Sequence, residues 1–462
     1  MNQSVAVAAR AESQVQDALD RLAEYVGYPA ISSKPERAAD VAALADRVCA
    51  DLRALGLESR VLTLPGALPT VAAEWTKAPG KPTILVYGHL DLQPADEPDW
   101  VSPPHIPTIV GDRLFARGSA DDMGGWVSHL AAIRAWFEET GSLPCNIRMI
   151  VEGEEEIGSP NLERYMDAFP EAFAADVMIL TDCENPSTDI PGLTVSLRGL
   201  MEIELSCKAL EADGHSGLWG NMVPDVTIAL MRLIARITDE DGRLSVGRVE
   251  VDAARKDSAK RVPLTAEVIR EGAHLLPGVE PLPVRDRSSA EWMWWQPAVT
   301  VIATNLPPYD KKKNALRREA KAILSVRVAP GQKATDLYDV ITRELLRDPP
   351  GGVAVSCEPH GTTGDGWLYT PKGPAFEAAD RAYVRAWGRP LVQVGVGGSI
   401  PFVALFGRKY GDLPLILNGV MDPLTTAHGP NESLHLGVFR KAVLANVHLY
   451  DELSQVAYAK RG

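Results

Sequence analysis

The 462-residue sequence has few cysteines, no long apolar run and no excess of positive charge. Its five cysteines lie far apart and form no CxxC pair: Cys49, Cys145, Cys183, Cys207 and Cys357. This pattern indicates neither a disulfide framework nor a cysteine zinc site, and it predicts a protein of the reducing cytoplasm. No run approaches the ~18 apolar residues of a membrane span, and the first residues have no signal-peptide core.

The charge balance is acidic, with 61 Asp and Glu against 47 Lys and Arg and a formal net charge of -14. Nucleic acids and anionic membranes bind basic surfaces, so we expect neither of them as a partner. A negative field instead concentrates cations. The chain is also too long for one compact core, so we expect two domains.

Short apolar strands alternate with amphipathic helices in the first part of the chain, with strands at 83–88, 146–151 and 177–182 and a helix at 126–139. This rhythm predicts an α/β domain with a mostly parallel sheet covered by helices on both faces. After Arg198 the apolar residues alternate with a period of two, which is typical of a sheet with one exposed face.

The last part of the chain returns to the first pattern, with an apolar strand at 413–419 and a closing helix at 435–453. We therefore expect a catalytic domain interrupted by an inserted α+β lid and dimerisation domain. The predicted ranges are 1–197 and 363–462 for the catalytic domain and 198–362 for the lid.

The stretch MIVEGEEEIGS, residues 149–159, places four glutamates at the end of an apolar strand, where like charges repel one another. Other acids and histidines also follow strand ends, in the motifs GHLDLQPAD, RGSADDMGG, LTDCEN and TAHGPNE. Ligands of open α/β sheets bind outside the carboxyl ends of the strands, so these side chains are expected to converge. Cations are needed to hold such acids together.

A count of charges favours two metal ions over one. With Asp121, Glu156 and Asp182 as anionic ligands and His89 and His428 neutral, three carboxylates and one hydroxide balance two divalent ions. Histidine and carboxylate without cysteine form a ligand set suited to zinc, and also to cobalt or manganese.

The combined motifs resemble the dinuclear zinc peptidase family that includes glutamate carboxypeptidase, aminoacylase, succinyl-diaminopimelate desuccinylase and cytosolic carnosinase. The matching stretches are GHLDLQP, FARGSADDMGG, GEEEIGS, LTDCEN, SLRGLMEIEL, DGHSG, SVRVAPG, GGSIP and AHGPNE, which run in family order from about residue 80 to 435. The large lid and the GGSIP loop look most like the carnosinase-type dipeptidase branch.

This resemblance implies that Asp121 bridges two zinc ions, with His89 and Asp182 completing one site and Glu156 and His428 the other. Asp91 would orient the imidazole of His89. Glu155 falls on the general base, and its side chain is expected to diverge from that of Glu156 because the segment is taken to be extended. A hydroxide held between the ions would attack the amide carbon of a short substrate with a free carboxylate.

The resemblance also assigns residues to substrate binding. His215 would cross a homodimer interface in the lid and help stabilise the oxyanion of the partner's site. Arg327 would hold the substrate's carboxylate as a bidentate partner. Asn314, Ser399 and Gly398 are further candidates for contacts with the carbonyl and the carboxylate.

Two interpretations of the substrate remain open. Aspartate at position 182 favours a dipeptidase, because acylases and carboxypeptidases of this family often carry glutamate there. Two departures indicate either an amidohydrolase of N-acyl amino acids or of an atypical amide without a free amine, or a dipeptidase in which another acid pairs with the ammonium. Met123 replaces the family's usual lysine, and Val396 stands where the carnosinase branch has a glutamate that meets the substrate's ammonium. A metal-binding protein without catalysis is a third reading, which Glu155 argues against.

Overall fold

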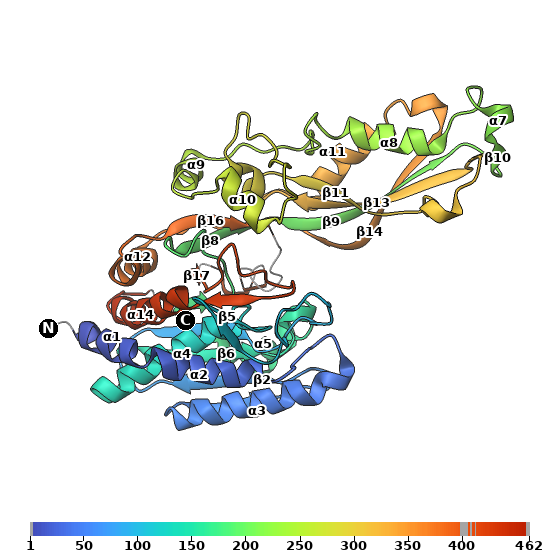
Figure 1. The fold of residues 1–462 in the computed structure, drawn as a ribbon. Helices are drawn as coiled ribbons and strands as arrows, with labels where there is room; N and C mark the ends of the chain where they lie inside the picture. Colours follow the sequence, from blue (N-terminus) through green and yellow to red (C-terminus); the bar gives the residue numbers. More distant parts are fainter. Residues whose placement is uncertain (1–2, 398–404, 407–408, 412, 459–462) are drawn as a thin grey trace.

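A twisted main sheet forms the base of the molecule in the computed structural model, which describes residues 3–397, 405–406, 409–411 and 413–458 (Figure 1). Within these residues its strand order is β1-β2-β6-β3-β7-β17. The strands are β1 Glu58–Leu62, β2 Thr70–Trp75, β6 Asn146–Glu152, β3 Thr83–His89, β7 Val177–Leu180 and β17 Leu415–Leu417. β6, β3, β7 and β17 pair in parallel and β2 is antiparallel to β6, so the predicted mostly parallel sheet is confirmed.

Helices cover both faces of this sheet, as the sequence predicts. Alternation along β3 sends Ile84 and Val86 into one core and Leu85 and Tyr87 into the other. The first core is formed with α1 Gln3–Ser13, α2 Val15–Val26, α3 Ala38–Ala54, α4 Met123–Thr140, α12 Pro374–Trp387 and α14 Leu436–Leu453. The second core is formed with α5 Leu162–Ala168 and α6 Pro170–Phe173.

A smaller sheet, β15-β8-β16, lies between the main sheet and the inserted segment of residues 199–364 (Figure 1). Its strands are β8 Gly192–Leu197, β15 Trp367–Leu368 and β16 Val392–Val396, and β16 runs parallel to β8. A three-stranded sheet lies near the loops that carry the predicted ligands Asp121 and His428. It joins β4 Thr108–Val110, β5 Arg113–Phe115 and β18 Ser433–His435. Strands from distant parts of the chain therefore frame the carboxyl edge of the main sheet.

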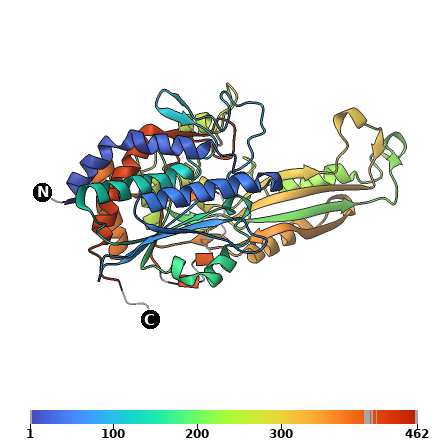
Figure 2. The same cartoon turned by 90° about the horizontal axis from the view of Figure 1, so that it is seen from below.

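An antiparallel sheet, β11-β13-β9-β14, extends away from the main sheet in both views (Figures 1 and 2). Its strands are β9 Gly199–Lys208, β11 Ala298–Thr304, β13 Glu319–Val328 and β14 Ala354–Gly364. The helices α8 Val226–Arg236 and α11 Ala334–Leu346 pack on one face, and β13 alternates between half-buried and buried residues along its whole length. The period of two after Arg198 thus reflects a sheet with one covered face.

The far end of this sheet carries β10 Gly214–His215, β12 Ala315–Leu316 and the short helix α7 Ser216–Trp219 (Figure 1). Residues between α8 and β11 fold back instead, with α9 Ala253–Ala259, α10 Ala266–Gly272 and a helical turn at Glu291–Trp295. Val251, Ala259, Trp294 and Trp295 form a core with Val392 and Val394 of β16 and with other residues. Part of the predicted lid therefore packs directly on the smaller sheet.

Four further short helical turns complete the described elements: Pro35–Arg37, Glu155–Ile157, Tyr309–Lys311 and Pro350–Gly352. Among the helices of the described ranges, none combines the length and apolar character that a membrane span requires. The exact division at residues 197 and 362 stays a prediction, although β8 ends at Leu197 and β9 begins at Gly199.

Candidate metal centre and active site

The carboxyl ends of four adjacent strands, β6, β3, β7 and β17, bring predicted ligands together. His89 is the last residue of β3, and it pairs in register with Glu152 at the end of β6. Asp182 follows the end of β7 by two residues, and His428 lies in the loop after β17. The convergence expected from parallel strands therefore brings these residues to one rim of the main sheet.

Asp121 lies between the two histidines. Its Oδ1 is 3.3 Å from His89 Nε2, and its Oδ2 is 3.0 Å from His428 Nε2. His89 Nε2 is also 3.9 Å from Asp182 Oδ2, and His428 Nε2 is 3.3 Å from Glu156 Oε2. One aspartate thus contacts both a His89–Asp182 pair and a His428–Glu156 pair, which is the arrangement expected of a carboxylate shared by two cations.

The donor set fits divalent metal ions. His89 is fully buried, and its Nε2 has no hydrogen-bond partner of acceptable geometry among the described residues. Candidate ligand atoms lie within 4.8 Å of one another in two groups, His89 with Asp121 and Glu156, and His89 with Glu155 and Asp182. A buried imidazole nitrogen that faces carboxylate oxygens without a hydrogen bond is a donor arrangement that fits a divalent cation.

The pKa values of these side chains reflect their burial and the repulsion between neighbouring carboxylates. Burial and the charge of Asp121 raise the pKa of Asp182 to about 7 and that of Glu156 to about 8. Burial opposes ionisation of Asp121 as well, but the neighbouring imidazoles of His428 and His89 hold its pKa below the ordinary value. Hydrogen bonding to Asp121 raises the pKa of His428 to about 9. Bound cations relieve this repulsion because they favour the ionised carboxylates.

Asp91 positions the glutamates as well as the histidine. Its main-chain oxygen is 3.0 Å from His89 Nδ1, and its carboxylate oxygen Oδ1 is 3.6 Å from the same atom. The carboxylate also accepts hydrogen bonds from the backbone N–H groups of Glu155, at 3.1 Å, and Glu156, at 3.0 Å. Gln93 Nε2 donates to Glu156 Oε2 at 2.8 Å, which fixes that carboxylate from the other side.

The four glutamates of the acidic stretch have different partners. Glu155 and Glu156 lie in a single 3₁₀ turn, Glu155–Ile157, and not in the extended segment that the sequence interpretation assumed. Successive side chains of such a turn still diverge, and the two glutamates accordingly join different candidate ligand groups. Glu152 contacts the Tyr87 hydroxyl, and burial raises its pKa to about 8.

Glu154 is buried and accepts hydrogen bonds from Leu68 N, at 2.8 Å, and Asn161 Nδ2, at 2.9 Å. Neither Glu152 nor Glu154 is therefore a solvated surface acid. Each has a separate set of donors that makes its burial tolerable.

Asp122 supports the histidine from behind. Its Oδ2 accepts hydrogen bonds from the Thr181 hydroxyl, at 2.7 Å, and from His89 N, at 3.2 Å. A Cβ on Gly88 would lie 2.5 Å from Asp122 Oδ2, and one on Gly125 would lie 2.2 Å from Asp122 Oδ1. The close approach of this carboxylate therefore favours glycine at positions 88 and 125.

Glu432 is a residue that sequence reasoning left without a role. Its buried carboxylate accepts hydrogen bonds from Gly118 N, Ala120 N and Asp121 N at 3.0–3.1 Å, and from Arg117 Nη1 at 3.0 Å. Arg117 in turn donates to the His428 carbonyl at 3.3 Å. This pair connects the loop that carries Asp121 to the loop that carries His428. The only signal in the sequence was its place in the AHGPNE motif.

The remaining predicted residues lie elsewhere. His215 is exposed in β10, and Ser216 N donates to the Asn314 carbonyl, so both residues lie at the far end of the antiparallel sheet (Figure 1). The described chain does not bring them to the metal ligands. Arg327 is half-buried near the other end of β13, opposite Leu200 of β9. Gly398 and Ser399 lie outside the described residues.

Comparisons with known proteins identify the family of this chain. A model of Peptidase family M20/M25/M40 matches residues 85–452. The cysteinylglycine-S-conjugate dipeptidase of Corynebacterium striatum is 32% identical over 417 residues, which cover 89% of this chain and 90% of that protein.

Two solved structures share the fold at 21% identity each, human carnosine dipeptidase 1 with a TM-score of 0.79 and Dug1p of Saccharomyces cerevisiae with 0.77. In both, the match covers 99% of this chain and 100% of the other.

The chain belongs to peptidase family M20/M25/M40. The predictions of a metallopeptidase and of a likeness to the carnosinase-type dipeptidase branch are thereby confirmed. The family binds divalent metal ions, and the two groups of candidate ligand atoms described above fit such ions.

Proposed function

We propose that this protein is a dipeptidase that uses two divalent metal ions, most simply zinc, to cleave a short substrate with a free carboxylate. The observation that carries the proposal is Asp121 set between His89 and His428, with Glu155 adjoining the same cluster. His89, Asp121 and Asp182 would hold one ion, and Asp121, Glu156 and His428 the other. When bound, such ions polarise a carbonyl and lower the pKa of a water molecule to near 7.

The chain's own residues carry the proton and orient the ligands. Glu155 would accept a proton from the attacking water and return it to the leaving amine. It is suited to this task because the Asp91 carboxylate holds its backbone N–H, while Glu156 is held by Gln93. Asp91 contacts His89 and the backbone N–H groups of Glu155 and Glu156. Its proposed role is therefore to position these residues.

Arg327 would bind the substrate's carboxylate. Its guanidinium is near that of Arg198, and burial together with the charge of Arg327 lowers the pKa of Arg198 to about 10. No ion pair with a carboxylate is found for either arginine among the described residues. Two neighbouring cations without an internal anion favour an anionic group from the substrate.

The proposed reaction is tested by hydrolysis of a dipeptide, its N-acetyl derivative and its C-terminal amide. We expect metal-dependent cleavage of the dipeptide, loss of activity with a chelator, recovery with added zinc, and a rate reduced about 10-fold or more for the amide. Turnover of only the acetylated compound would favour the N-acyl amidohydrolase, for which Val396 is the specific supporting observation. Chelator-resistant turnover would refute both.

We also propose a homodimer formed through the lid. The far end of the antiparallel sheet exposes large apolar side chains, including Trp219 at 53%, Met222 at 84% and Ile302 at 51%. β11 is an edge strand of that sheet. Exposed apolar patches and open strand edges mark association surfaces. His215 and Asn314, which lie at this end, would then serve the active site of the partner.

Subunit complementation tests this arrangement. His215→Ala and Glu155→Gln are each expected to be inactive alone. Mixing the two after dissociation is expected to restore activity, because a hybrid dimer contains one site with both wild-type residues. No recovery, in a mixture shown by mass to contain hybrids, would contradict the proposal.

The five cysteines are all unpaired in the structure, which supports the proposed reducing, cytoplasmic location. We also propose the division into a catalytic domain of residues 1–197 and 363–462 and a lid of residues 198–362.

A further inference from the structure

A cavity of about 360 Å³ adjoins the metal-ligand loops. It is bounded on one side by Glu184, which follows the ligand Asp182 by two residues, and by Thr426 and Ala427, which precede the ligand His428. α10 and the helical turn at Glu291–Trp295 form the opposite side. The cavity is therefore shared between the rim of the main sheet and the part of the lid that folds back onto β16.

Most of the lining is apolar. The side chains are Leu264, Val268, Ile269 and Ala273 from α10 and its approach, Met293 and Trp294 from the helical turn, and Pro423 and Ala427 from the loop after β17. Its volume is in the range of small-molecule sites. An apolar cavity next to the position where a peptide bond is cleaved suits the side chain of the substrate residue on that side of the bond.

Glu184 is a solvent-exposed carboxylate at the edge of this cavity, and it has no partner within the described residues. The other acid, Asp422, is buried and forms an ion pair with Arg113 at 2.8 Å. For the Glu184 carboxylate, no hydrogen bond or ion pair is found within the described parts of the chain. Glu184 follows the ligand Asp182 by two residues and lines the cavity together with Thr426 and Ala427, so it lies beside the metal-ligand loops.

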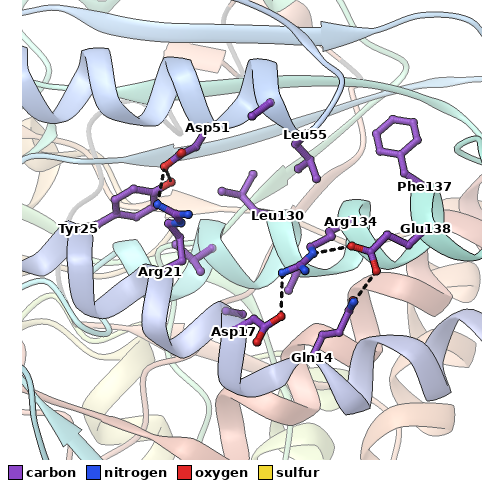
Figure 3. Close-up of a pocket in the computed structure, with 14 residues that line it drawn as sticks. Gln14, Asp17, Arg21, Tyr25, Asp51, Leu55, Leu130, Arg134, Phe137 and Glu138 are labelled. Atoms are coloured by element: carbon purple, nitrogen blue, oxygen red, sulfur yellow. Dashed lines mark hydrogen bonds and ion pairs between the residues drawn. The ribbon is translucent and has the colours of Figure 1, made fainter.

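A second cavity shows the contrast. It measures about 480 Å³ and lies between α2, α3 and α4 (Figure 3). Each of its charged groups has an ion-pair partner: Arg21 pairs with Asp51 at 3.2 Å, and Arg134 pairs with Asp17 at 3.1 Å and Glu138 at 2.7 Å. That cavity offers no unpaired charged group to a ligand, whereas the cavity beside the metal site offers the carboxylate of Glu184.

We propose that Glu184 binds the ammonium group of the substrate's N-terminal residue, and that the apolar cavity beside it accepts a large apolar side chain of the same residue. The inference rests on the proposed dipeptidase function and names its substrate class: dipeptides with a free amine and a bulky apolar first residue.

This assignment resolves the difficulty raised by Val396. That valine is half-buried at the end of β16, where an apolar side chain cannot pair with an ammonium. Glu184 supplies a carboxylate from the loop after β7 instead. The ammonium is thus bound by a residue that follows β7 and not by one at the end of β16. The cavity between these two strand ends and α10 remains apolar.

The charge is tested with Glu184→Gln, using Phe-Gly and N-acetyl-Phe-Gly as substrates. The variant is expected to lower kcat/KM for Phe-Gly by about 10- to 100-fold, the range for a lost charge-assisted hydrogen bond, and to leave N-acetyl-Phe-Gly within about 2-fold of wild type. Glu267→Gln is the matched control, since Glu267 is exposed on α10 and outside the cavity. Its values are expected to equal those of wild type.

Equal effects of Glu184→Gln on both substrates, or none on either, would overturn the inference while the dipeptidase function stands. If wild type cleaves neither compound, the proposed function itself fails. Circular dichroism and metal content at wild-type values are required of each variant.

The apolar cavity is tested with Val268→Trp, at a half-buried position of α10 where a larger side chain projects into open space. The ratio of kcat/KM for Phe-Gly to that for Gly-Gly is expected to fall at least about 10-fold, since filled volume excludes only the large side chain. An unchanged ratio in a folded, metal-loaded variant would place the side chain elsewhere.

Discussion

Replacing Glu155 by glutamine is expected to lower kcat by about 10²- to 10⁴-fold, the range that general acid–base catalysis contributes. The amide keeps the shape of the side chain but cannot accept a proton from water. Its backbone hydrogen bond to Asp91 is unaffected, so Glu156 and the other ligands should keep their positions. Steady-state kinetics on a dipeptide, with metal content measured on the same sample, give the result.

The informative outcome is a loss of kcat with two metal ions still bound. Glu163→Gln, on the exposed side of α5, is the matched control and should behave as wild type. A variant that has lost metal would show that Glu155 is a ligand, since it also lies among candidate ligand atoms with His89 and Asp182. Unchanged turnover would remove Glu155 from the mechanism.

The main sheet and the convergence of its strand ends were predictable because apolar strands leave a strong pattern. Parallel strands such as β3 and β7 are buried on both faces, so each appears as a short continuous apolar run that ends at a polar residue. A ligand placed one or two residues beyond such a run, as His89 and Asp182 are, must lie at the same rim.

The supporting residues were not predictable, because their roles depend on contacts between distant loops. Glu432 lies 311 positions from Asp121, and nothing nearby distinguishes it from a solvated glutamate. Glu154 similarly stands in a run of glutamates, but it accepts a hydrogen bond from the backbone N–H of Leu68, 86 positions away. The proposed role of Glu184 depends on a cavity whose opposite side is formed by α10, which is distant in the sequence.

Replacing Glu432 by glutamine is expected to have the largest effect on stability of any single change near the site. The buried carboxylate accepts three backbone hydrogen bonds and one from Arg117, so the amide would turn a donor toward other donors and leave a buried guanidinium without its counter-charge. Breaking a buried ion pair by removing one partner costs about 3–5 kcal/mol. Urea unfolding of the metal-free protein measures this loss without a contribution from metal binding.

The same variant should also bind metal about 10- to 100-fold more weakly, as is typical when a group that orients a ligand is removed. Glu432 holds the backbone of Asp121, and Arg117 holds the carbonyl of His428, so the two ligands that meet at one ion lose a common support. Competition with a chelating dye measures the affinity.

The double variant Arg117→Met, Glu432→Gln should lose less unfolding free energy than the sum of the two single variants. Arg117→Met alone leaves the Glu432 carboxylate without its counter-charge, and Glu432→Gln removes that unpaired charge. Additive effects, or wild-type metal affinity in Glu432→Gln, would show that this pair stabilises the fold without positioning the ligands.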